Sequence, residues 1–232
     1  MEKELAELRS RIADAAHRAG RDPEDVCLVA VSKTHPAETI RQAVTAGIRV
    51  FGENRVQEAQ RKAAELPLED YDVELRLIGH LQSNKAKLVP GLFAWVESID
   101  SLKIAQTLAR QFAESGKRCN VLLQLNSSGE ESKSGFGSSE ELLAAAAEIA
   151  ERSELTIRGV MTIGPFVEDS DQIRRAFSMT RDCFFRLQQD LDLPEIDTLS
   201  MGMSDDFELA IEEGSTEVRI GSAIFGSRGS YA

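Results

Sequence analysis

A lysine directly follows an apolar run near the start of the chain. Residues 26–32 read VCLVAVS, which is typical of a buried β-strand, and Lys33 comes next. If the stem of this lysine lies against apolar walls, the loss of hydration disfavours the charged form and populates the neutral amine. A neutral amine can form a Schiff base with an aldehyde. A solvated or ion-paired lysine is the commoner alternative, and Lys85 and Lys133 are less firmly held competitors, in an expected helix and a loop respectively.

Two stretches near the C-terminus have the composition of a phosphate site. SMGMS at 200–204 and RIGSA at 219–223 each follow an apolar run and precede a helical pattern. Backbone N–H groups, hydroxyls and a helix N-terminus at such places bind phosphate. The alternative is that the glycines make tight turns and the serines cap helices. Because both stretches accompany a strand-end lysine, we favour a phosphorylated aldehyde such as pyridoxal 5′-phosphate as the ligand.

Arg219 is the third chemical element, two residues before Gly221. An inward guanidinium there can contact the nitrogen of a pyridine ring and, being always protonated, would keep that nitrogen unprotonated. Such a ring withdraws electrons less strongly, so fewer reactions that pass through a carbanion are possible. An internal ion pair of Arg219 with Glu53 or Glu97 is the alternative.

These residues need a scaffold that brings the ends of several strands together. The apolar runs that read as strands are 26–32, 48–52, 75–79, 93–97, 119–125, 157–163, 197–202 and 217–221. We expect a helix after each, with Pro36 at a first helical position and a capping box from Ser138 and Glu141. Nearly continuous apolar strands that alternate with helices indicate a parallel sheet, and eight such units in about 200 residues favour a closed (β/α)8 TIM barrel. In such barrels the active face lies at the carboxyl ends of the strands, where Lys33 and the two stretches fall.

The sequence predicts one domain over residues 1–232. Apolar residues recur at helical spacing up to Gly20, which predicts an N-terminal helix over 1–20 packed on the barrel. No linker or compositional break suggests a boundary. The three cysteines are widely separated and show no metal-ligand spacing, so we expect buried thiols, no metal site and a reducing, cytoplasmic environment.

The charge balance excludes some partners. The chain has 39 acidic and 27 basic residues, for a formal net charge of −12. Such a surface repels phosphate backbones and anionic membranes, so we expect no nucleic-acid partner. No apolar run approaches the roughly 20 residues of a membrane span, and we expect no membrane association.

Several motifs together resemble one known family over residues 30–228. They are VAVSKTHP, FGENRVQE, LIGHLQSNK, SKSGF, LSMGMSDD and VRIGSAIFG, in this order. They resemble the pyridoxal phosphate homeostasis proteins, which are single-domain relatives of the alanine racemase barrel. The resemblance implies an alanine-racemase-like barrel that holds pyridoxal 5′-phosphate as an internal aldimine of Lys33. It also implies that Arg219 faces the ring nitrogen. The further cofactor-binding residues that it implies are Asn54, Ser200, Met203, Ser204, Gly221 and Ser222.

The same resemblance raises the question of catalysis. Alanine racemases carry a second domain and use a tyrosine from it as the acid/base on the face opposite their lysine. The tyrosines here are Tyr71, before the third strand, and Tyr231, beside the C-terminus. Racemisation by two bases needs a proton donor on each face, and only Lys33 is a candidate. His17, His35 and His80 are expected at the surface without a catalytic role.

We therefore expect a non-catalytic protein that binds, buffers and delivers pyridoxal phosphate in vitamin B6 and amino-acid homeostasis. Its recipients would be pyridoxal-phosphate-dependent apoenzymes, and it would be a monomer because the racemase dimer interface is missing. A pyridoxal-phosphate-dependent amino-acid racemase of narrow specificity is the first alternative. A barrel enzyme that acts on phosphosugars, with Lys33 as an aldolase lysine and no cofactor, is the second.

Overall fold

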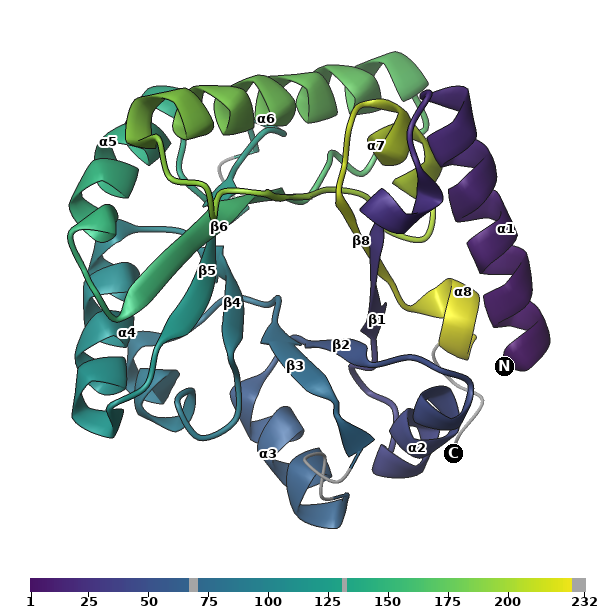
Figure 1. Ribbon diagram of the computed structural model, residues 1–232, viewed down its shortest axis with the longest axis horizontal. Coiled ribbons are helices and arrows are strands. Elements are labelled where there is room, and N and C mark those ends of the chain that lie inside the picture. The colour runs from purple at the N-terminus through teal and green to yellow at the C-terminus, as the bar shows by residue number, and fades with distance from the viewer. Residues whose placement is uncertain (67–70, 131–132, 227–232) are drawn as a thin grey trace.

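Eight parallel strands close into a barrel in the computed structural model, which describes residues 1–66, 71–130 and 133–226 (Figure 1). The strands are β1 (Cys27–Val31), β2 (Val50–Glu53), β3 (Glu74–Leu77), β4 (Trp95–Ile99), β5 (Cys119–Leu125), β6 (Leu155–Thr162), β7 (Thr198–Ser200) and β8 (Glu217–Ile220). They pair in sequence order and β8 pairs with β1. The predicted closed barrel is confirmed, and every predicted strand end lies within two residues of the observed one.

Helices surround the ring of strands on its outside (Figure 1). The α-helices are α1 (Glu2–Arg18), α2 (Ala37–Thr45), α3 (Val56–Glu65), α4 (Leu102–Ser115), α5 (Ser139–Ala150), α6 (Ser170–Leu191), α7 (Phe207–Glu212) and α8 (Ser222–Phe225). Short 3-10 helices η1 (Pro23–Asp25) and η3 (Ser83–Leu88) complete the described part. The helices bury apolar residues against the barrel and against one another, and these residues form the main core outside the ring of strands.

Two details of the helices differ from the prediction. The segment after β3 is the short 3-10 helix η3 instead of an α-helix, and Pro90, which has no N–H to donate, limits its length. Pro36 is the N-cap residue of α2 and not its first helical residue. The predicted cap of α5 is present: the Ser138 hydroxyl accepts from the Glu141 N–H at 3.1 Å, while the Glu141 carboxylate accepts from the Gly137 N–H at 2.9 Å.

The pairing of β1 with β8 closes the barrel and brings the two ends of the chain together. Strand β1 pairs with β8 in a register that sets Val29 beside Arg219. Helix α1 packs against α7 and α8, as Figure 1 shows, and Arg11 and Glu208 form an ion pair at 2.7 Å across this contact. The N-terminal helix is thus fixed on the barrel by an apolar stripe and by charge pairs.

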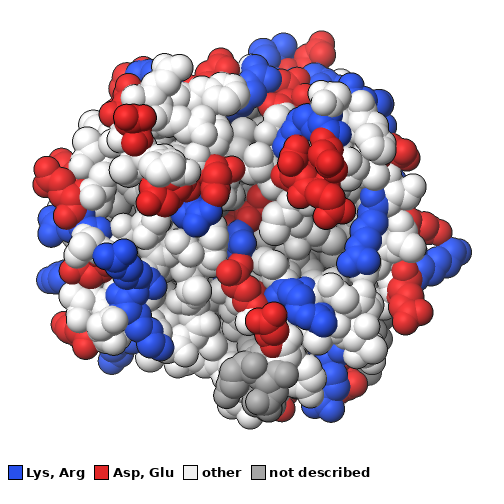
Figure 2. Space-filling model, in the orientation of Figure 1, with Lys and Arg blue, Asp and Glu red and all other residues white. Residues whose placement is uncertain are grey.

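Cys119 and Cys183 are buried as expected, whereas Cys27 is only partly buried because it lies at the start of β1. Burial raises the pKa of the Cys27 thiol to about 12, so this thiol stays protonated near neutral pH. Basic and acidic side chains are interspersed on the face shown in Figure 2. Among the described residues, no group of His, Cys, Asp and Glu could hold a metal ion, and no helix is long and apolar enough to cross a membrane.

Candidate functional site

A cavity of about 530 Å³ opens where the strands end, and it collects nearly all the residues expected there. From the predicted set, Lys33, Asn54, Met203, Ser204, Arg219, Gly221 and Ser222 line it. The other lining residues are Val31, Thr34, His35, Ile78, Ile163, Asp205 and Gly226. The lining therefore joins an amine from the end of β1, a guanidinium from β8 and hydroxyls from the loops after β7 and β8.

Lys33 is carried by a short turn whose neighbours are both fixed. The Ser32 hydroxyl donates to Glu53 Oε1 at 2.6 Å, and the Ser32 N–H continues the ladder to the carbonyl of Gly52 at 3.1 Å. On the other side, Thr34 adopts a left-handed conformation with φ of 67°, and its N–H donates to Glu58 Oε1 at 2.5 Å. The backbone around the lysine is therefore held firmly at the mouth of the barrel.

Arg219 is almost completely buried and held by two acceptors. Its Nη2 donates to the Thr162 carbonyl at 2.6 Å, and its Nη1 donates to Ser200 Oγ at 2.5 Å. The direct ion pair that the sequence left open is not formed, because Glu53 pairs with Lys62 and Glu97 lies 3.6 Å from Arg76. Arg219 is therefore held in a fixed position and is also part of the cavity lining.

Ser200 occupies a different place from the other predicted residues. It is fully buried and is absent from the cavity lining. Its hydroxyl accepts from Arg219 and donates to Glu97 Oε2 at 3.1 Å. Of the predicted set, Ser200 thus contacts the guanidinium and not the open cavity.

Beneath Ser200 the barrel interior is charged. Arg76 donates to Glu217, lies 3.6 Å from Glu97 and stacks over the Trp95 ring at 4.0 Å from its centroid. Burial, together with the neighbouring Glu217 charge, raises the pKa of Glu97 well above its ordinary value. One oxygen of Glu97 and one of Glu217 lack a hydrogen-bond partner in the described structure. A proton on Glu97 relieves both the repulsion and the missing bond.

The loops after β7 and β8 depend on glycine. Gly202 has φ of 94°, and a Cβ there would lie 2.6 Å from the Ala210 side chain, so no larger residue fits. The Met203 N–H donates to the buried Asp206 carboxylate at 2.6 Å, which fixes the turn that presents Ser204. A Cβ on Gly221 would lie 3.1 Å from the Val31 carbonyl, so glycine lets the loop after β8 approach β1 closely.

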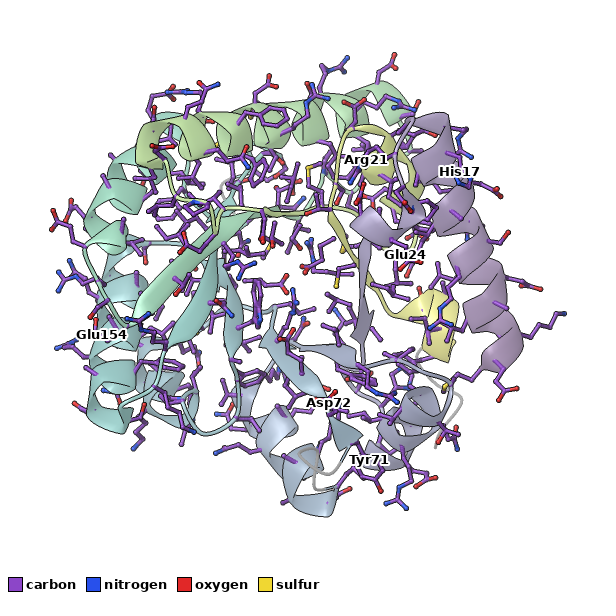
Figure 3. The ribbon with its side chains drawn as sticks, viewed as in Figure 1. His17, Arg21, Glu24, Tyr71, Asp72 and Glu154 are labelled. Atoms are coloured by element: carbon purple, nitrogen blue, oxygen red, sulfur yellow. The ribbon has the colours of Figure 1, made fainter. Side chains whose placement is uncertain are left out.

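One histidine prediction was wrong. His35 is buried, lines the cavity, and packs its ring 5.1 Å from that of Phe225. The connection from β1 to α2 passes beside α8, so this residue packs against Phe225 instead of facing solvent. His17 is exposed on α1 (Figure 3), and His80 is exposed and bonded to Asp100 at 2.7 Å, both as expected.

The competing lysines and Tyr71 lie outside the cavity lining. Lys85 is in η3, and Lys133 donates to the Gly164 carbonyl and pairs with Glu130 at 2.6 Å. Tyr71, labelled in Figure 3, precedes β3 and so lies towards the amino ends of the strands. Tyr231 falls outside the described residues.

Sequence reasoning missed the charged residues that support Lys33. Lys62, Glu53 and Glu58 are all within reach of the turn around the lysine. The spacing of Glu58 and Lys62 on α3 was the available signal, but such i,i+4 pairs are usually solvent-exposed. Here Lys62 is only 3% exposed.

The chain is similar to known proteins along nearly its whole length. Residues 4–229 match the model of a family described as alanine racemase, N-terminal domain. The pyridoxal phosphate homeostasis protein of Pseudomonas aeruginosa is 47% identical over 224 residues, which cover 97% of this chain and 94% of that protein. The protein of the same name from Escherichia coli K12 is 46% identical over 228 residues, with coverage of 97% and 95%.

Solved structures agree with this likeness. PipY of Synechococcus elongatus, in a structure with PLP bound, superposes with a TM-score of 0.85 at 38% identity and covers 97% of this chain and 99% of that one. An alanine racemase from Clostridium difficile superposes with a TM-score of 0.72 at 14% identity, and the match covers 99% of this chain but 58% of that one. This second likeness concerns the barrel fold alone.

Proposed function

The chain belongs to the pyridoxal phosphate homeostasis protein family, and we propose that its barrel-mouth cavity binds pyridoxal 5′-phosphate for vitamin B6 and amino-acid homeostasis. One observation carries the proposal. A single cavity joins the Lys33 amine, the Arg219 guanidinium and the serine- and glycine-containing loops after β7 and β8. Its volume of about 530 Å³ falls within the range of small-molecule sites.

The residues present fit this cofactor. Ser204 and Ser222 offer hydroxyls to a phosphate, and Gly221 lines the same cavity beside Ser222. Arg219 would face the ring nitrogen and keep it unprotonated, while Asn54 and Met203 would flank the ring. Lys33 would supply the amine that condenses with the aldehyde, with release of one water. When bound, the cofactor supplies an electrophilic carbon that exchanges between amines.

The rigid position of Arg219 and of the backbone at Lys33 is suited to binding and releasing the cofactor. Arg219 is set by Thr162 and Ser200, and the backbone at Lys33 is set from both sides, so binding needs little rearrangement. An incoming amine that displaces Lys33 would carry the cofactor away. We include in the proposal that the protein works without catalysing a reaction of its own, as a cytoplasmic monomer that serves pyridoxal-phosphate-dependent apoenzymes. No tyrosine occurs among the described residues that line the cavity, which supports this reading over a two-base racemase.

Absorbance of the reconstituted protein tests the proposal. Mixed with pyridoxal phosphate, the wild type is expected to show an imine band that Lys33→Ala lacks, and borohydride reduction should leave a cofactor-sized adduct on Lys33. Lys85→Ala, which changes a lysine outside the cavity lining, is the matched control and should behave as the wild type. If wild type and Lys33→Ala both give the spectrum of free cofactor, the assignment is wrong.

A second measurement addresses catalysis. The protein is incubated with single L-amino acids, and the D-enantiomer is detected by a coupled oxidase. No turnover is expected. Turnover of about 1 s⁻¹ or more, which is usual for enzymes, would show that the protein is a racemase and not a carrier.

A further inference from the structure

Lys62 is a buried lysine for which the proposed chemistry has no direct use. It lies on α3, is 3% exposed, and does not line the cavity. Its ammonium donates to the Ser32 carbonyl at 2.7 Å and to Glu53 Oε1 at 2.7 Å, and it pairs with Glu58 Oε1 at 2.8 Å. A lysine ammonium has three N–H donors, and three acceptors surround this one. The three acceptors therefore engage the whole of this group, and Lys62 is not itself an attachment point.

The acceptors of Lys62 are the groups that fix the chain on both sides of Lys33. The Ser32 carbonyl belongs to the peptide unit that joins Ser32 to Lys33. Glu53 also accepts from the Ser32 hydroxyl at 2.6 Å. Glu58 also accepts from the Thr34 N–H at 2.5 Å. One ammonium thus ties together the residue before Lys33 and the carboxylate that holds the residue after it.

The local backbone needs such support. Thr34 has φ of 67°, a left-handed conformation that is unfavourable for a β-branched residue. The Glu58 carboxylate that bonds its N–H is itself held by Lys62. Without the ammonium, nothing in this network would neutralise Glu53 and Glu58, and the turn would lose the partner that joins its two sides.

A simple structural role for Lys62 would be to neutralise Glu53. That role does not account for the contact with the Ser32 carbonyl, because this oxygen carries no net charge and lies next to the reactive residue. Nor does it account for the ion pair with Glu58, whose carboxylate accepts from the N–H of Thr34, the residue after Lys33.

We propose that Lys62 is a positioning residue that sets the Lys33 amine at the distance needed for covalent attachment of the aldehyde. The inference rests on the proposed function. It predicts that Lys62 affects the covalent part of binding and leaves the phosphate and ring contacts unchanged, since these come from the loops after β7 and β8 and from Arg219.

The test compares two ligands on variants of the full chain. Pyridoxal phosphate uses all the contacts, whereas pyridoxamine phosphate carries an amine in place of the aldehyde and cannot join Lys33. Lys62→Met alone leaves Glu53 buried and unpaired, so the chain can fail to fold. The double variant Lys62→Met with Glu53→Gln removes both charges and is the variant on which the test depends. Lys87→Met, an exposed lysine of η3, is the control.

For the double variant we expect affinity for pyridoxal phosphate to fall about tenfold or more, with a weaker imine band, because small displacements of a reacting group have large effects. Affinity for pyridoxamine phosphate should change less than about twofold, within the additivity error of distant sites. Lys87→Met should match the wild type for both ligands.

Other results overturn the inference in distinguishable ways. An equal loss for both ligands would show that Lys62 supports the whole site, and no loss for either would show that it has no positioning role. If the wild type itself forms no imine band, the proposed function fails and the inference fails with it. A readout that needs no cofactor separates these cases. Lys33 is labelled with an amine-reactive ester, and the extent of labelling is measured by mass spectrometry. It should differ from the wild-type extent in the double variant and equal it in Lys87→Met. Unchanged labelling would count against positioning even where the cofactor binds.

Discussion

Replacing Ser200 by alanine separates two roles that this serine could have. The family resemblance implies a phosphate contact, but the structure buries the side chain completely and leaves it out of the cavity lining. Its hydroxyl accepts from Arg219 Nη1 at 2.5 Å and donates to Glu97 Oε2 at 3.1 Å. We therefore expect Ser200→Ala to act through Arg219 and through the stability of the cofactor-free protein.

The size of the effect follows from the two lost hydrogen bonds. Each involves a charged or potentially charged partner, and such bonds contribute about 1.5–3 kcal/mol. Some of this is recovered when the neighbours relax, so we expect a loss of about 3 kcal/mol in the free energy of unfolding. For a chain of this length that corresponds to a fall in Tm of about 6–12 °C.

Thermal unfolding of the cofactor-free protein measures this loss. Ser222→Ala is the matched control, because it removes the same hydroxyl from an exposed residue that lines the cavity. The control should keep the wild-type Tm and lose affinity for pyridoxal phosphate. Ser200→Ala should show the lower Tm and, because Arg219 is less firmly held, a shifted absorbance of the bound cofactor.

The opposite pattern would refute the reasoning. If Ser200→Ala changes the Tm by less than about 2 °C, less than one kcal/mol for a chain of this size, and weakens cofactor binding as Ser222→Ala does, then Ser200 contacts the phosphate directly. The cavity would then have to reach deeper than the described structure shows.

Two further predictions concern the interior and the rim. Burial raises the pKa of Glu97, so its contribution to stability is complete below the ordinary value of about 4.3 and is lost as pH rises towards the folded-state value. Glu97→Gln removes this loss, so its urea midpoint should rise relative to that of the wild type as the pH increases above the ordinary carboxyl value. A difference between the two midpoints that is the same at every pH would contradict the ionisation assigned to Glu97. Gly79→Ala would place a Cβ 2.3 Å from the Asn54 carbonyl oxygen, so we expect a loss of about 2–3 kcal/mol and weaker cofactor binding, measured by Tm and by titration. Gly91→Ala, where no atom lies within 4 Å of the added Cβ, should change neither the Tm nor the affinity for the cofactor. If Gly79→Ala has as small an effect as Gly91→Ala, the backbone around Asn54 can move aside at little cost.

The fold was predictable because its strands are buried on both faces. Their nearly continuous apolar runs stand out from the amphipathic helices, and eight repeats of this alternation leave few architectures open. The same geometry placed Lys33 and the loops around Gly202 and Gly221 at one end of the barrel. Position along a strand is enough for such a prediction, because parallel strands all end at the same edge.

The direction of individual side chains was harder to predict. Ser200 is the last residue of β7, and the sequence does not tell whether such a residue points up into the cavity or down to Arg219. Lys62 and Glu58 look like an exposed helical pair, and their burial depends on how α3 lies against the turn after β1. His35 looked like a loop residue because its contact with Phe225 joins segments nearly 200 positions apart.

The pairing of β1 with β8 affects the order in which the protein can acquire its ligand during synthesis. Lys33, the amine proposed to join the ligand, is made early, just after the first strand, whereas Arg219 and the serines that line the same cavity belong to the last two strand units. A growing polypeptide therefore exposes a lysine without a binding pocket, and capture of an aldehyde must wait until translation has passed the eighth strand. For the same reason, a protease cut that frees the final strand would release the ligand even though the lysine and most of the barrel are intact.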